Sequence, residues 1–337
     1  MEDECDLQVK TIIKGLGRPY YQTELGAAYR ATSLRLLKKI PDNSIDLIFT
    51  SPPFALTRKK EYGNVSASNY VNWFKSFSKE FRRILKKEGS LVIDIGSAWN
   101  PGTPTKSLYQ YKLLIALVKQ KYHFCQDFFW YNPAKLPSPA EWVNVRRIRV
   151  KDSVNYVWWL SKTDFPKADN RKILKEYSKS MMDLLENGYK AKLRPSGHDI
   201  SEKFSKDNSG AIPPNLLQIA NTESNSYYLK RCKEESIKPH PARFPPQFAE
   251  FFIKFLTDEG DVVLDPFAGS NVTGWVAQGL KRSWISIERV EEYVKGSKLR
   301  FEEPNTYQPS ENGKLDDAQN GSLENYLEWK IANKGKR

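Results

Sequence analysis

The sequence predicts an α/β fold with a mainly parallel sheet, and three observations lead to that prediction. Apolar runs at residues 45–49, 90–97 and 261–265 have the length and composition of buried strands. Helical patterns with one apolar face, such as residues 70–87, alternate with these runs. The chain has 337 residues, enough for one large α/β domain or for a core with a smaller insert.

The first part of this core comprises residues 1–162. Its first 24 residues are polar and aromatic, and we expect a lead-in there. A strand is predicted at 27–31, a short helix at 33–39 and a buried strand at 45–49. Aromatic side chains at helical spacing assign residues 70–87 to a core helix, which Gly89 is expected to close. A strand at 90–97, a helix at 108–119 and strands at 128–131 and 153–160 follow.

The remainder of the chain divides into three parts by composition. Residues 163–235 are rich in Lys, Ser and Asn, with a helix predicted at 171–186. Residues 236–301 return to the strand–helix pattern, with a helix at 247–256 and strands at 261–265 and 284–287. Residues 302–337 form a polar tail, expected to be disordered over most of its length, to which we assign no function.

The segment Ser51-Pro52-Pro53-Phe54 directly follows the buried strand at 45–49. The two prolines have no N–H and fix φ, so we expect an extended and rigid backbone. It presents the Ser51 hydroxyl, the Ser51 and Pro52 carbonyls and the Phe54 ring where open α/β sheets bind ligands. The alternative is a turn that merely ends the strand.

Hydrogen-bond acceptors beside an aromatic ring suit a planar base with an exocyclic amine. The amine of cytosine or adenine is a poor nucleophile, because its lone pair is delocalised into the ring. Acceptors that bind its two hydrogens localise that lone pair and stabilise the transition state. Phe54 would stack on a base extruded from a duplex. Asp94 either lines this pocket or only caps its strand.

A second motif, Asp265-Pro266-Phe267-Ala268-Gly269-Ser270, forms a glycine turn between a strand and a helix. The next strand ends in Glu288, roughly 20 residues on, where nucleotide-binding folds place an acid on the ribose hydroxyls. The turn lacks both the Lys-Ser or Lys-Thr of a P-loop and the glycines of the dinucleotide fingerprint. An adenosine without a pyrophosphate fits, and S-adenosylmethionine is one.

Together these motifs resemble the bacterial amino-methyltransferases that act on DNA, in which the tetrapeptide is Ser/Asp/Asn-Pro-Pro-Tyr/Phe. The order, with the catalytic motif before the cofactor motif, resembles the beta class. The resemblance covers most of residues 25–300 and implies a circularly permuted class I (Rossmann-like) methyltransferase fold with S-adenosylmethionine as cofactor. The Ser-Pro-Pro-Phe form is similar to the subgroup that methylates N4 of cytosine. The implied catalytic residues are Ser51, Pro52, Pro53 and Phe54.

The resemblance also implies where the cofactor and the target sequence are bound. Residues 163–235 correspond to a target-recognition region between the two catalytic parts. Family members often have an acid after the strand at 27–31, where this chain has Thr32-Ser33, so the contact to the adenine amine is in question. The implied cofactor-binding residues are Arg243, Phe244, Asp265, Phe267, Ala268, Gly269, Ser270 and Glu288.

The charge predicts a polyanionic partner, which we take to be double-stranded DNA. The net charge is +13, with 53 Lys and Arg. Arg146, Arg147 and Arg149 alternate with apolar residues, as a phosphate-contacting surface requires, although a charged strand edge is the alternative. Lys59 and Lys60 belong to a charged loop next to the Ser51 segment.

Other features narrow the location and the chemistry. The three cysteines have no metal-site spacing and the three histidines are scattered, so we expect no metal site and a reducing cytoplasm. No apolar run is long enough to cross a membrane, and the first residues are acidic rather than signal-like. We expect a bacterial cytoplasmic protein, monomeric or weakly dimeric.

The predicted function is transfer of a methyl group to N4 of cytosine in duplex DNA, as part of a restriction-modification system. Transfer is direct, because methylation of the cytosine ring carbon needs a Cys after Pro, and no cysteine here follows a proline. Two alternatives stay open. One is methylation of adenine at N6, which Ser51 disfavours, and the other is a non-catalytic basic DNA-binding protein.

Overall fold

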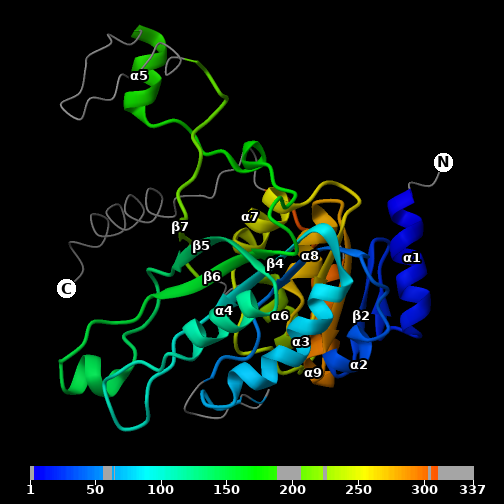
Figure 1. Ribbon diagram of the computed structural model, residues 1–337, viewed down its shortest axis with the longest axis horizontal. Helices are drawn as coiled ribbons and strands as arrows, with labels where there is room; N and C mark the ends of the chain where they lie inside the picture. The colour runs from blue at the N-terminus through cyan, green and yellow to red at the C-terminus, as the bar shows by residue number, and fades with distance from the viewer. Residues whose placement is uncertain are drawn as a thin grey trace.

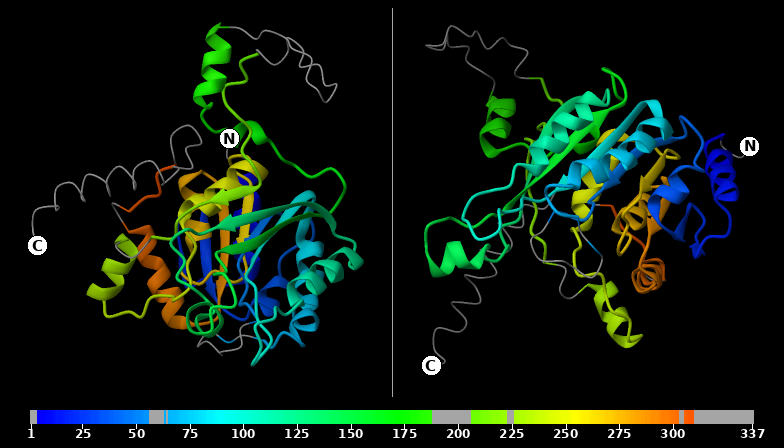
Figure 2. Two further views of the ribbon diagram at one scale, coloured as in Figure 1. Left: turned by 90° about the vertical axis from the view of Figure 1, so that its left-hand side faces the viewer. Right: turned by 60° about the horizontal axis from the view of Figure 1, so that its bottom comes forward.

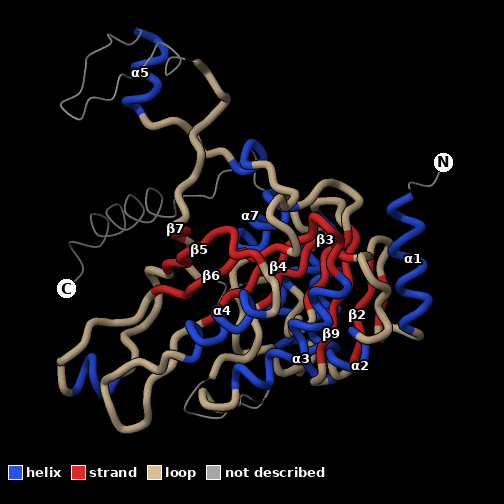
Figure 3. Tube along the Cα trace, viewed as in Figure 1, coloured by secondary structure: helices blue, strands red, loops and turns tan. Residues whose placement is uncertain are grey.

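The computed structural model describes residues 4–55, 63, 65–187, 206–222, 226–302 and 305–309. Within these ranges a nine-stranded sheet runs through the centre of the molecule in the order β1-β2-β9-β8-β3-β4-β6-β5-β7 (Figure 3). The strands are β1 (Tyr21–Gln22), β2 (Gly26–Arg30), β3 (Ile45–Thr50), β4 (Leu85–Ile95), β5 (His123–Tyr131), β6 (Val154–Ser161), β7 (Leu216–Gln218), β8 (Val262–Asp265) and β9 (Ser283–Glu288). The α-helices are α1 (Glu4–Leu16), α2 (Ser33–Leu37), α3 (Tyr70–Ile84), α4 (Tyr109–Lys119), α5 (Lys179–Asn187), α6 (Tyr227–Glu234), α7 (Pro246–Leu256), α8 (Val272–Gly279) and α9 (Glu291–Lys298).

The sheet is mainly parallel, which confirms the predicted fold class. Strands β2, β9, β8, β3 and β4 pair in parallel, and β7 pairs in parallel with β5. Strand β6 is antiparallel to both β4 and β5, and β1 is antiparallel to β2. The strands of the glycine-turn motif, β8 and β9, lie between β2 and β3 although they come last in the chain. This placement is the permuted order that the motifs predict.

Helices cover both faces of the sheet (Figures 1 and 2). Alternating strand residues divide between two apolar clusters, so that Ile48 packs with α1, α2, α3 and α4 on one face. Phe49 packs with α7 and α8 on the other face, 5.6 Å from the ring of Phe252. Because the central strands are buried on both faces, their sequences are continuous apolar runs.

Several sequence predictions need correction at element boundaries. The expected lead-in contains helix α1, whose apolar face is buried and whose Ile13 carbonyl accepts a hydrogen bond from Tyr29. Helix α3 ends at Ile84, before Gly89, because the chain enters β4 at Leu85. The helix predicted at 171–186 is a short 3₁₀ turn, η2 (Asn170–Ile173), followed by α5. At the start of the tail Tyr307 packs on Trp275 and donates to Glu250, and the rest of the predicted tail, residues 310–337, lies outside the described residues.

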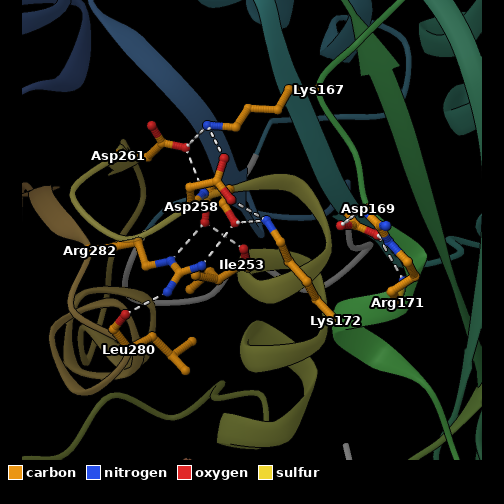
Figure 4. Close-up of polar contacts among 10 residues, drawn as sticks. Lys167, Asp169, Arg171, Lys172, Ile253, Asp258, Asp261, Leu280 and Arg282 are labelled. Atoms are coloured by element: carbon orange, nitrogen blue, oxygen red, sulfur yellow. Dashed lines mark hydrogen bonds and ion pairs between the residues drawn. The ribbon is translucent and has the colours of Figure 1, made fainter. Parts of the chain in front are cut away.

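A charged cluster joins the start of the 163–235 segment to the amino end of β8 (Figure 4). Lys167 lies 2.7 Å from Asp258 and 2.5 Å from Asp261, and Lys172 also pairs with Asp258. The pKa of Asp258 is lowered to about 2 by its hydrogen bonds to the two lysines. The cluster therefore ties the inserted segment to the C-terminal part of the core, at the opposite end of the sheet from the motifs.

Two segments project from this core (Figures 1 and 2). One carries α5, within the 163–235 segment, and its return brings β7 to the edge of the sheet. The other is the connection between β5 and β6, residues 132–153, which carries the π-helical turn η1 (Glu141–Val145) and which we call the arm. The edge strand on this side of the sheet is β7, and in Figure 1 α5 lies above the sheet whereas the arm lies at its lower left.

Candidate active site

A cavity of about 930 Å³ opens at the carboxyl ends of the central strands. All four residues of the Ser51-Pro52-Pro53-Phe54 segment line it, as predicted. Thr50, the last residue of β3, donates a 2.8 Å hydrogen bond to Oδ1 of Asp265 and so joins the ends of β3 and β8. The two motifs, more than 200 residues apart in the chain, therefore meet at one cavity.

Asp94 belongs to this cavity and is not only a strand cap. It lies on β4 next to β3, and its Oδ2 accepts a 2.9 Å hydrogen bond from the Ser51 hydroxyl. Its Oδ1 accepts from Nδ2 of Asn155 at 3.1 Å. Burial raises the pKa of Asp94 to about 6, although both hydrogen bonds and the nearby charge of Lys135 oppose that shift.

Phe54 is fixed by close packing against the backbone. A Cβ added at Gly96 would lie 2.5 Å from the Phe54 ring, so only glycine allows the ring to lie there. The partly buried ring also lines the cavity. Its position beside the Ser51 hydroxyl suits it to stack on a planar ligand whose amine reaches Ser51.

The glycine turn forms a second wall. Gly269 has φ of +52°, and its N–H donates a 2.9 Å hydrogen bond to Oε2 of Glu288. The other oxygen of Glu288 accepts from the Val290 N–H at 2.8 Å, and burial raises the pKa of this acid. A Cβ at Gly269 would approach the His240 ring to 3.1 Å. A side chain at residue 269 would therefore strain the turn and crowd the His240 ring, and both residues line the cavity.

Most predicted cofactor residues line the cavity, and Asp265 does not. It lies beneath the turn, 2% exposed, and accepts hydrogen bonds from Thr50, Thr273 and the Phe267 N–H. Its position indicates that it supports the turn. The predicted residues that do line the cavity are Arg243, Phe244, Phe267, Ala268, Gly269, Ser270 and Glu288.

The two ends of the cavity differ in polarity. At one end Phe267 lies 5.8 Å from Trp73 and 5.1 Å from Phe77, between ring centroids, beside Ser33, whose hydroxyl donates to the Pro266 carbonyl. At the other end Arg243 packs over Tyr228, and its Nε is buried without a hydrogen-bond partner in the described ranges. One end thus suits a flat apolar ring, and the other suits an anion.

The lining also includes polar residues that were not singled out from the sequence, three of which lie close to the predicted site residues. Lys135 follows the carboxyl end of β5, Asn155 lies on β6 after the arm, and His240 precedes Arg243. Asn155 interrupts the apolar run 154–160, which is a signal for a polar contact within a strand. Burial lowers the pKa of His240 to about 4, so its ring is neutral near pH 7.

The predicted DNA-contacting arginines lie on the arm, outside the cavity. Arg146 pairs with Glu141 at 2.8 Å and packs over Trp142. Arg149 is bound to Asp152 at 3.1 Å, whereas Arg147 is exposed and has φ of +55°. The arm is a π-helical turn with loops and is not a strand edge. Lys59 and Lys60 lie outside the described residues.

Two features are absent from the described residues. No helix there has both the length and the apolar character needed to cross a membrane. No group of three or more His, Cys, Asp or Glu side chains in the same ranges is arranged to bind a metal ion.

Comparison with known proteins places these features in context. The profile of the DNA methylase family matches residues 45–299. The type II methyltransferase M.PvuII of Proteus hauseri is 54% identical over 288 residues, covering 84% of this chain and 86% of the relative. M.ScaI of Streptomyces caespitosus, also a type II methyltransferase, is 28% identical over 86% of this chain and 85% of its own length.

Solved structures agree. The PvuII DNA methyltransferase, described as cytosine-N4-specific, matches with a TM-score of 0.71 and 45% identity, over 92% of this chain and 96% of that chain. A putative DNA modification methylase from Thermus thermophilus, complexed with S-adenosyl-L-methionine, matches with a TM-score of 0.51 and 18% identity. It covers 81% of this chain and 92% of that one, and at this identity it supports the fold alone.

Proposed function

The chain belongs to the DNA methylase family, and from that membership we propose that it transfers a methyl group from S-adenosylmethionine to the N4 amine of cytosine in DNA. The single structural observation that carries the proposal of amine methylation is the Ser51–Asp94 pair at the end of β3, next to the glycine turn. The cytosine-N4-specific relative covers nearly the whole chain, which favours this reaction over methylation of adenine and over a non-catalytic DNA-binding protein.

The residues around the cavity fit S-adenosylmethionine. Its adenine suits the apolar end at Phe267, its ribose hydroxyls suit the acceptor oxygens of Glu288, and its carboxylate suits the buried, unpartnered Nε of Arg243. Gly269 lines the cavity where the adenosine would lie. When bound, the cofactor supplies a methyl group on a positively charged sulfur.

The Ser51 segment acts on the amine. Because the Ser51 hydroxyl donates to Asp94, its oxygen lone pairs remain available to accept one amine hydrogen. The carbonyl oxygen of Pro52 accepts the other amine hydrogen. Both bonds strengthen as the nitrogen becomes tetrahedral, so they lower the barrier. Phe54 stacks on the extruded base and holds its amine in line.

We propose that double-stranded DNA lies across the arm and the segment 163–235. Arg147 and its neighbours on the arm supply positive charge, and the polar 163–235 segment supplies side chains for recognition of bases. Support comes from the net charge of +13 and from the arm, whose residues Asn132, Lys135 and Ser153 line the cavity. In this proposal residues 1–162 and 236–301 are the two catalytic parts.

The relatives are type II methyltransferases, so we propose that this enzyme protects DNA within a bacterial restriction-modification system. In this proposal the enzyme acts on DNA in the cytoplasm, as a monomer or a weak dimer. The experiment that tests the reaction is digestion of DNA methylated by the purified protein, followed by identification of the modified nucleoside. N4-methylcytosine is the expected product, and N6-methyladenine would overturn the proposal.

A further inference from the structure

Lys135 lines the same cavity as Ser51 but has no part in the reaction described above. A chain of hydrogen bonds connects the two residues. Nζ of Lys135 donates to Oδ1 of Asn155 at 3.4 Å, and Nδ2 of Asn155 donates to Asp94 at 3.1 Å. Asp94 in turn accepts from Ser51. The ammonium group therefore lies two side chains away from the group that binds the target amine.

The ammonium of Lys135 has unused hydrogen-bonding capacity. A lysine ammonium carries three donors, and in the described ranges the one hydrogen-bond acceptor of Lys135 is Asn155, at 3.4 Å. Burial lowers its pKa, while the carboxylates of Asp94 and Asp152 oppose the shift. A partly buried cation with free donors is costly unless a ligand in the cavity supplies an acceptor.

We propose that Lys135 donates a hydrogen bond to the O2 oxygen of the target cytosine and thereby selects cytosine over adenine. The inference rests on the proposed function, because it assumes that a base amine binds at Ser51. Beside its amine, cytosine presents two acceptors in sequence, N3 and O2. Adenine presents one acceptor, N1, and then a C–H, so a donor at the second position along this edge distinguishes the two bases.

The other edge of the cytosine ring carries only C–H groups, which offer nothing to Asn155 or Lys135. The edge with N3 and O2 is therefore the one that offers hydrogen-bond acceptors to Asn155 and Lys135 on this wall of the cavity. Adenine in the same position would leave the donors of Lys135 unpaired in a partly buried site, which costs affinity in the transition state. This asymmetry makes Lys135 a specificity residue even though it does not contact the reacting nitrogen.

The test replaces one atom of the substrate. A duplex with the site that the wild-type enzyme methylates is made with either cytosine or 2-thiocytosine at the target position, since sulfur is a weaker acceptor than oxygen. The wild-type enzyme should lose about 10-fold in kcat/KM with the thio base, the size of one hydrogen bond to a charged group. Lys135→Met should lose about 10-fold on cytosine and show no further loss with the thio base.

Three further variants and substrates complete the design. Lys135→Arg keeps a donor and should retain part of the sulfur effect, and Lys112→Met, an exposed site on α4, should behave as wild type. A third duplex carries adenine at the target position. The ratio of the methylation rate on cytosine to the rate on adenine should be smaller for Lys135→Met than for the wild-type enzyme. Cofactor affinity, measured by calorimetry, should not change in any variant.

Two results would overturn the inference. One is the absence of a sulfur effect in the wild-type enzyme, which needs no folded variant to observe. The other is a full sulfur effect in Lys135→Met, which would show that Lys135 only supports Asn155. Failure of the proposed function is recognised separately, because the nucleoside digest of wild-type product would then contain no N4-methylcytosine.

Discussion

The hydroxyl of Ser51 donates a 2.9 Å hydrogen bond to Oδ2 of Asp94, and this contact orients the catalytic segment. The donor of the hydroxyl is directed at the carboxylate, so the oxygen can only accept from a ligand in the cavity. Asp94 is 2% exposed and is itself held by Asn155. The acceptor at Ser51 is therefore in place before the base arrives, as electrostatic catalysis requires.

Replacing Ser51 should reduce the rate far more than the affinities. Ser51→Ala removes a hydrogen bond that strengthens in the transition state, worth roughly 2.7–4 kcal/mol or 100- to 1000-fold elsewhere. We expect the lower end, because the Pro52 carbonyl remains. Single-turnover methylation with saturating DNA and cofactor measures the change, with the exposed Ser66→Ala as control. If Ser51→Ala methylates at the wild-type rate, the hydroxyl does not contribute and the backbone carbonyls alone bind the amine.

The methylation rate should fall as the pH drops through about 6. Burial raises the pKa of Asp94 to about 6, and protonation weakens its hold on the Ser51 hydroxyl. Stability should change in the opposite direction. The folded pKa lies above the unfolded value near 4, so the contribution of Asp94 to stability is largest below that value and is lost as pH rises through 6.

Asp94→Asn separates these effects from those of other groups. Asp265, whose pKa burial also raises to about 6, titrates in the same range, so the comparison with wild type isolates Asp94. The variant should methylate slowly, and its rate should not fall further as the pH drops from 7 to 5. Its stability, measured by denaturant titration, should depend less on pH. If the rate of Asp94→Asn still falls as the pH drops through 6, the titrating group is not Asp94.

The sequence predicted the fold class and most of the site because both follow from local patterns. Central strands buried on two faces are apolar runs, and Ser51-Pro52-Pro53-Phe54 and the Gly269 turn each sit directly after such a run. Helix α1 was missed because its sequence has only a narrow apolar stripe. The structure shows the purpose of that stripe, since the helix packs near Tyr29, whose hydroxyl donates to the Ile13 carbonyl.

Contacts between distant segments could not be predicted in the same way. Asp94, Asn155 and Lys135 come from β4, β6 and the arm, and only the antiparallel pairing of β4 with β6 brings the first two together. Sequence spacing contains no information about that register. The role of Asp265 beneath the turn is likewise visible only from its three hydrogen-bond donors on neighbouring elements.

Removing the acid at the end of β9 should weaken cofactor binding. Glu288 holds the Gly269 N–H and is proposed to accept from the ribose hydroxyls. Glu288→Ala should therefore raise the dissociation constant of S-adenosylmethionine by an amount equivalent to about 1–3 kcal/mol, the scale of charge-assisted hydrogen bonds. Calorimetry measures it, with Glu291→Ala on α9 as control. Unchanged affinity would remove Glu288 from the ribose.

A buried arginine, Arg282, lies at the end of the sheet opposite the cavity, and we expect it to contribute to stability and not to cofactor binding. Arg282 is 7% exposed and donates to Thr257 Oγ1 at 3.0 Å, to the Thr257 carbonyl at 2.8 Å and to the Leu280 carbonyl at 2.6 Å (Figure 4). Arg282→Met should lower the free energy of unfolding by roughly 2–4 kcal/mol, because buried acceptors lose charged donors.

Chemical denaturation measures this loss, and Arg171→Met is the matched control. Arg171 pairs with Asp169 on the surface of the same region, with its side chain 82% exposed. An ion pair in solvent contributes little, so this variant should unfold at the wild-type denaturant concentration. Equal effects of the two substitutions would show that burial does not determine the contribution of Arg282.

The arm should control how DNA affinity responds to salt. Each phosphate neutralised by a cation changes the slope of log K against log salt concentration by about 0.9. Arg147 is exposed and has no ion pair in the described ranges, so Arg147→Ala should flatten the slope by about that amount. Arg146 is already paired with Glu141, so adding Arg146→Ala should flatten it by less. The matched double variant Lys14→Ala, Lys281→Ala removes two charges outside both the arm and the 163–235 segment and should leave the slope intact. A slope that neither arm substitution changes would place the DNA elsewhere.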